Sequence, residues 1–153
     1  MGEVIKNGPV NGKVATQLKR IIAQAERHPG VIIPDIVLQT DCSFRLSPRN
    51  FAAVMVGRPR GSTAVIGVCE NFSDQPLTRI RGILWHEIGH ILDDIHGKRK
   101  WRKRTKIRGA DDEQWADLAV AIMCKTRIYY DNDLVQRAGP GARGYWPRPK
   151  GLR

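Results

Sequence analysis

Residues 86–90 read His-Glu-Ile-Gly-His and lie in the strongest helical pattern of the chain. Four apolar residues recur around them at helical spacing: Leu84, Ile88, Ile91 and Ile95. Two histidines four residues apart lie on one face of a helix, where both imidazoles can bind a single metal ion. The glutamate after the first histidine lies beside that face and can accept a proton from metal-bound water. The motif therefore predicts a metal site on a buried helix over 77–96, with His86 and His90 as ligands, Glu87 as general base and Zn²⁺ as the ion.

A zinc site of this kind needs a third protein ligand, and two residues compete for that role. Glu113 lies in the first turn of the next predicted helix, and Asp117 follows one turn later on the same face, where it can accept the free N–H of a ligating histidine. The alternative is His96, six residues after His90, which requires the helix to break sharply in between. Asp93 stands where a glycine would usually break it, and the apolar stripe continues past this point. We therefore favour Glu113 over His96.

The rest of the chain predicts an α+β domain in which a helix and a short antiparallel sheet precede two further helices. Two extended segments are joined by the turn-rich RPRGS and predict a hairpin, while Pro34 makes a third segment an edge strand or two pieces. Asp111 and Gln114 have the spacing of a capping box for the last helix. Helices are expected over 14–25, 77–96 and 110–130, and strands over 31–40, 51–57 and 63–70.

The 153-residue length and 41 % apolar content suit one domain with a real core. We expect a loose N-terminal segment over 1–12, the domain over 13–136 and a basic, Gly/Pro-rich flexible tail over 137–153. No apolar stretch is long enough for a membrane span, and no secretory leader is visible. Three widely spaced cysteines favour a reducing compartment. We therefore expect a protein that is not secreted and lies in the cytoplasm, or with a nucleoid or virion.

Half of the Lys and Arg residues lie in two segments, 98–108 and 137–153. The chain has 26 Lys and Arg against 15 acidic residues, for a net charge of +11, and residues 98–108 are expected to form a basic loop. This charge favours nucleic acid as a partner of the loop and tail, although a solvated loop and a solubilising tail are the alternative. Trp101 either stacks on bases or packs back onto the domain. The eight cations of the segment are Lys98, Arg99, Lys100, Arg102, Lys103, Arg104, Lys106 and Arg108.

The pair of motifs His86-Glu-Ile-Gly-His90 and Glu113-Gln-Trp-Ala-Asp117 resembles the gluzincin arrangement of zinc peptidases. The resemblance is to small intracellular forms, the ImmA/IrrE-type peptidases and the minigluzincins, and covers roughly residues 50–130. It implies a zincin-like fold, zinc bound by both histidines and the later glutamate, and an aspartate that supports a histidine. It also implies a protein or peptide substrate along the edge strand before the active-site helix, here residues 63–70. The basic insertion between the helices departs from the family pattern, so the substrate class is not implied.

A second resemblance is to SprT- and WLM-type proteases, which cut proteins crosslinked to DNA. A third histidine follows HExxH there, and His96-Gly97 with Trp101 is similar in kind. Both resemblances imply peptide hydrolysis by a metal-activated water, with Glu87 passing the proton to the leaving amine. Tyr129, Tyr130 and the basic loop are candidates for a further donor to the transition state. A third hypothesis is a non-catalytic nucleic-acid-binding or virion-associated protein whose HExxH motif is structural.

Overall fold

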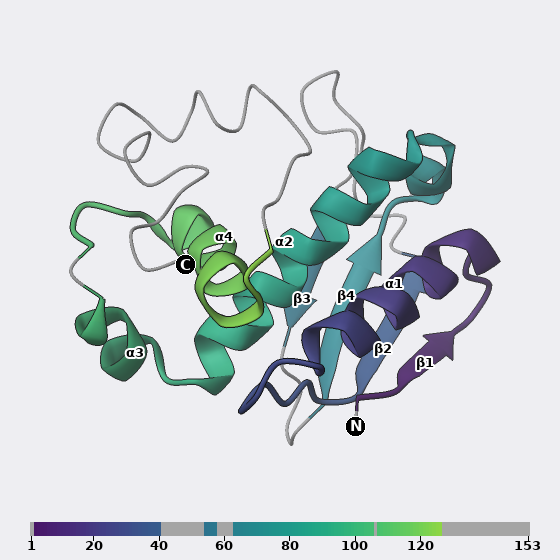
Figure 1. Cartoon of the computed structure of the whole chain (residues 1–153). Helices are drawn as coiled ribbons and strands as arrows, with labels where there is room; N and C mark the ends of the chain where they lie inside the picture. The colour runs from purple at the N-terminus through teal and green to yellow at the C-terminus, as the bar shows by residue number, and fades with distance from the viewer. Residues whose placement is uncertain (1, 41–53, 58–62, 106, 127–153) are drawn as a thin grey trace.

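The computed structural model describes residues 2–40, 54–57, 63–105 and 107–126 (Figure 1). The expected tail, Tyr129, Tyr130 and Lys106 lie outside these residues. The α+β class is confirmed. In chain order the elements are β1 (Val4–Asn7), α1 (Gly12–Ala25), β2 (Ile36–Thr40), β3 (Val54–Gly57), β4 (Ala64–Val68), the short 3-10 helix η1 (Glu70–Asp74), α2 (Leu77–Ile95), α3 (Lys98–Arg104) and α4 (Asp112–Cys124).

The strands of the described residues form one mixed sheet in the order β1-β2-β4-β3. β1, β2 and β4 are parallel, and β3 runs antiparallel to β4. The expected hairpin pairing of β3 with β4 is confirmed, but the expectation of an antiparallel sheet is wrong. The physical reason is that residues 4–7, expected to be loose, form a strand. Because α1 then carries the chain back across the sheet, β2 lies parallel to β1.

The two expected edge strands are both internal. β2 lies between β1 and β4, and β4 lies between β2 and β3. Pro34 precedes β2 instead of interrupting it, so it removes no hydrogen bond from the ladder. The expectation that residues 63–70 form the sheet edge before the active-site helix is therefore wrong. In the described part of the chain, β1 and β3 are the outer strands.

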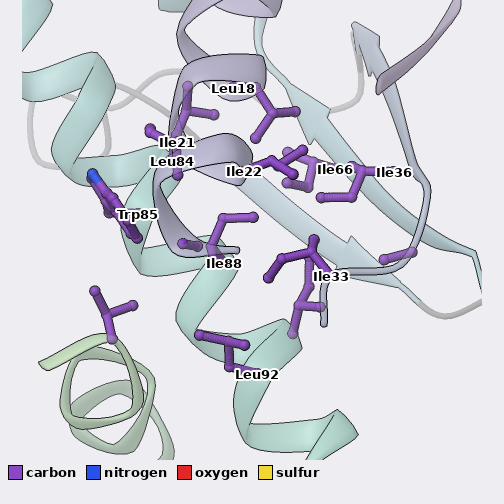
Figure 2. Close-up of a cluster of buried hydrophobic side chains, with 14 of the residues drawn as sticks. Leu18, Ile21, Ile22, Ile33, Ile36, Ile66, Leu84, Trp85, Ile88 and Leu92 are labelled. Carbon is purple, nitrogen blue, oxygen red and sulfur yellow. The ribbon is translucent and has the colours of Figure 1, made fainter. Parts of the chain in front are cut away.

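The core lies between the sheet and two helices that cover one of its faces, α1 and α2 (Figure 1). Side chains from α1, α2 and the sheet meet in one cluster, which Figure 2 shows around Ile22, Ile66 and Ile88. Each fully buried Leu or Ile contributes about 1.5–3 kcal/mol. Three residues of the apolar stripe predicted for 77–96 are thus buried, Leu84, Ile88 and Ile91, and Ile95 is partly buried. The opposite side of α2 faces α4. Within the described residues, no helix combines the length and apolarity needed to cross a bilayer.

The helix boundaries follow local signals in the sequence. Asn11 caps α1 by accepting a hydrogen bond from the Lys13 N–H. The capping box of α4 is confirmed: the Asp111 and Gln114 side chains each accept from the other's backbone N–H at 2.8 Å. α4 ends at Cys124, earlier than expected, with Lys125 in a left-handed conformation.

The basic segment is not simply a loop. Gly97, at φ 75°, ends α2, and the next seven residues form α3. Trp101, the one apolar residue of α3, is buried against α4, which explains why a run of cations adopts a helix here. The expectation of a loop over 98–108 is therefore wrong for residues 98–104.

Candidate metal centre

Gly89 has no side chain, and this lets α4 cross α2 at very close range. A Cβ atom added to Gly89 would lie 2.0 Å from the backbone oxygen of Ala116. Glycine is therefore required at this point of the helix crossing. The crossing holds the first turn of α4 beside the face of α2 that carries the two motif histidines. The sequence motif does not reveal this packing, because the residue before the second histidine of HExxH is unrestricted.

Three potential ligand atoms from the two helices converge. The Nε2 atom of His86 lies 2.7 Å from Oε2 of Glu113 and 3.1 Å from Nε2 of His90. The Nε2 atom of His90 lies 3.4 Å from the same Glu113 oxygen. Tetrahedral zinc with bonds of about 2.0–2.1 Å holds its ligand atoms about 3.3 Å apart. Two of the three separations are close to this value and the third is shorter, so two imidazoles and a carboxylate that converge in this way could hold a metal ion.

Asp117 contacts the other ring nitrogen of His86. Its Oδ1 lies 2.7 Å from Nδ1, and both residues are buried. An Nδ1–H that donates to this carboxylate leaves the Nε2 lone pair facing Glu113 and His90. A carboxylate behind a ligating histidine orients the ring and increases its basicity in many metal sites. The predicted pairing of Asp117 with a motif histidine therefore has the required geometry.

Glu87 is buried beside the two histidines. One ligand atom each from His86, Glu87 and His90 lie within 4.8 Å of one another. Burial raises the pKa of Glu87 to about 7, because the anionic form loses hydration, although both histidines oppose this shift. A carboxyl group with a pKa near neutrality is suited to accept a proton and to return it.

Carboxylates surround the two histidines and make the centre attractive to a cation. Burial alone would lower the pKa of His86, but hydrogen bonds to Asp117 and Glu113 outweigh it and raise this pKa to about 10. Hydrogen bonds to the two histidines hold the pKa of Glu113 well below its ordinary value, while burial raises that of Asp117. The negative field that favours an imidazolium here also favours a divalent metal ion.

The alternative third ligand lies elsewhere. α2 continues without a break from His90 to Ile95, and His96 is its C-cap residue. Its Nε2 atom is buried and has no hydrogen-bond partner among the described residues. Of the two candidates for the third ligand, the structure brings Glu113, and not His96, next to both motif histidines.

The cations of α3 divide into two groups. Arg102 is partly buried, and the other five cations of α3 are exposed: Lys98, Arg99, Lys100, Lys103 and Arg104. Arg108, after the end of α3, is also exposed. Trp101 is only 6 % exposed and packs edge-to-face on Trp115, with ring centroids 5.2 Å apart. Of the two hypotheses for Trp101, packing onto the domain is the one observed.

Arg102 differs from the exposed cations of α3 because its side chain contacts two carboxylates of this chain. Its Nε donates to Oδ1 of Asp93 at 2.9 Å, and its Nη2 donates to Oδ1 of Asp112 at 3.0 Å. Contact of Arg102 with nucleic acid stays a prediction, but two carboxylates of this chain already accept hydrogen bonds from its Nε and Nη2. Asp93 is fully buried and also accepts from Trp101 Nε1 at 2.9 Å. Little in the sequence signalled this pair, because Asp93 lies on the side of α2 opposite the apolar stripe, and a buried aspartate shows itself only through its partners.

No protein-family model matches this chain, and searches of curated proteins and of solved structures also find no match.

Proposed function

We propose that the protein is a zinc-dependent endopeptidase of gluzincin type with a zincin-like fold. The observation that carries this proposal is the convergence of His86, His90 and Glu113, with Asp117 behind the first histidine. These three residues would hold the ion. Bound zinc supplies Lewis-acid activation of a water molecule and of the substrate carbonyl.

In this mechanism Glu87 moves the proton. Its carboxylate accepts a proton from the attacking water and returns it to the leaving amine. Asp117 keeps the proton on Nδ1 of His86 and so keeps Nε2 available to the ion. An extended protein or peptide substrate can pair with β3, the outer strand on the α2 side in the described residues. Cys124 is a buried free thiol, which suits action in the cytoplasm, or with a nucleoid or virion.

Two other functions are possible outcomes of the tests. A SprT/WLM-type DNA–protein crosslink protease would use His96 as third ligand, but the unbroken end of α2 disfavours it. A non-catalytic nucleic-acid-binding or virion-associated protein would need no zinc. Both alternatives have less support than the centre formed by α2 and α4.

We expect the purified protein to bind about one zinc ion per chain and to cleave an unfolded protein substrate only when zinc is bound. Glu113→Ala should weaken zinc binding more than the roughly ten- to hundredfold expected for Asp117→Ala, because it removes a ligand and not a support. His96→Ala is the matched control and should leave zinc affinity nearly unchanged. Competition with a chelator measures the zinc affinity of all three variants. Severe loss in His96→Ala with little loss in Glu113→Ala would assign the chain to the SprT/WLM type, and absence of zinc would support the non-catalytic protein.

We also propose that nucleic acid is a partner of the exposed face of α3. If about three of its cations contact phosphates, the log–log salt slope for duplex DNA should be about −3. Replacing Lys100, Lys103 and Arg104 by Gln should reduce this slope by about one for each phosphate-binding cation removed, with little base specificity. The control is a triple variant in which three exposed cations of α1 are replaced by Gln: Lys13, Lys19 and Arg20. It has the same net charge as the α3 variant. Equal slopes for the two triple variants would show that α3 is an ordinary solvated helix.

A further inference from the structure

We infer that Arg102 is a positioning residue for the metal centre, which ties the start of α4 to α2 and so keeps Glu113 next to the two histidines. The inference rests on the proposed zinc function. It concerns a residue outside the two helices that carry the proposed ligands, α2 and α4, and it gives α3 a role in the centre itself.

The contacts of Arg102 join three helices. From α3, its guanidinium reaches Asp93 of α2 through Nε and Asp112 of α4 through Nη2. It also lies over the ring of Trp115 on α4, 5.2 Å from the centroid. A planar guanidinium can serve two carboxylates and an aromatic face together, whereas a lysine ammonium is a single flexible point charge. Because Asp93 is fully buried, one end of this bridge is held rigidly.

The residue that most needs positioning in the proposed centre is Glu113. Its side chain is 66 % exposed, against 9 % for that of His86. The capping box acts within α4 and cannot hold the helix against α2. Several contacts between helices do so, including the His86–Asp117 pair. Two of them lie on either side of Glu113 in the sequence: Arg102 binds Asp112, the residue before it, and Gly89 lets the Ala116 backbone approach α2 closely. Together they bracket the proposed third ligand on both sides in the sequence.

Removing the Arg102 charge altogether would leave Asp93 buried without its cation, so the test uses milder changes. Asp112→Asn removes the ion pair with α4, keeps no more than a neutral hydrogen bond in its place, and leaves the Asp93 pair intact. Arg102→Lys keeps a positive charge beside Asp93 but loses the planar guanidinium that can bind two carboxylates together. We expect each variant to bind zinc about tenfold more weakly, within the range for residues that support ligands. Arg81→Lys, at an exposed site on α2, is the matched control and should bind zinc as the unmodified protein does.

A double-mutant cycle separates positioning from the loss of a negative charge near the ion. If Asp112 acts through Arg102, adding Asp112→Asn to Arg102→Lys should weaken zinc binding no further. The visible spectrum of Co²⁺-loaded protein gives a second readout, because displacement of Glu113 changes the coordination of the ion, whereas a loss of fold stability alone does not.

The outcomes are distinct. Additive losses in the double variant, or unchanged zinc affinity in Asp112→Asn, would overturn the positioning role while leaving the proposed peptidase intact. Failure of the unmodified protein to bind either metal would overturn the proposed function, and the positioning role with it. Weakened zinc binding in both single variants, no further loss in the double variant and an altered Co²⁺ spectrum would establish it.

Discussion

Glu87→Gln is expected to abolish peptide hydrolysis while zinc stays bound and the fold stays intact. Glutamine has the size of glutamate but cannot accept a proton from water. Loss of general base catalysis lowers kcat by about 10²- to 10⁴-fold. Because the proposed ligands are the two histidines and Glu113, the zinc content should remain near one ion per chain. Hydrolysis of an unfolded protein substrate, zinc content and thermal unfolding should be measured on the same preparation.

Glu3→Gln, at an exposed glutamate near the N-terminus, is the matched control for this change and should retain full activity. Loss of zinc from Glu87→Gln would make the glutamate a ligand and would contradict its role as base. Activity retained at the level of the unmodified protein would contradict the proposed mechanism.

Gly89→Ala is expected to cause the largest loss of stability. The new methyl group would meet the Ala116 backbone at 2.0 Å, and a backbone oxygen cannot rotate away as a side chain can. Alanine gains about 1 kcal/mol over glycine in helix propensity. Overpacking in a core costs about 1–3 kcal/mol, and more where backbone must shift. We expect a net loss of about 2 kcal/mol or more in the free energy of unfolding, with zinc affinity falling because α4 moves away from α2.

Gly12→Ala is the control, because an added Cβ there meets nothing within 4 Å in the described part of the chain. It should leave the free energy of unfolding unchanged or slightly increase it. Urea unfolding with and without zinc measures both variants. A Gly89→Ala protein as stable as the Gly12→Ala protein, with unchanged zinc affinity, would show that the two helices are not held at this distance.

Much of the helical structure was predictable from the sequence, because it depends on local chemistry. The apolar period located α1 and α2, and Asp111 with Gln114 located the start of α4. The same local rule placed His86 and His90 on one face of α2. The sequence also singled out Glu113 and Asp117, since their spacing on the next helix suits a ligand and its support.

The tertiary structure decided what depends on residues far apart in the chain. The four residues of β1 were not predicted as a strand, because so short a segment depends on its pairing with β2. This pairing is parallel and makes the sheet largely parallel. The sequence predicted that Trp101 and Arg102 lie in a basic loop. In the structure both contact α2 and α4, and no local pattern of the sequence indicates these contacts.

The third ligand position of the proposed metal centre is the clearest case. Glu113 and His96 both had acceptable residue chemistry, and helical spacing made neither impossible. The distance from Glu113 to the two histidines depends on how closely α4 crosses α2, which Gly89 permits and Arg102 supports. The residues of the centre were therefore determined locally by the sequence. Which of them meet was decided by helix packing, because contacts between separate helices depend on the shape of the whole core.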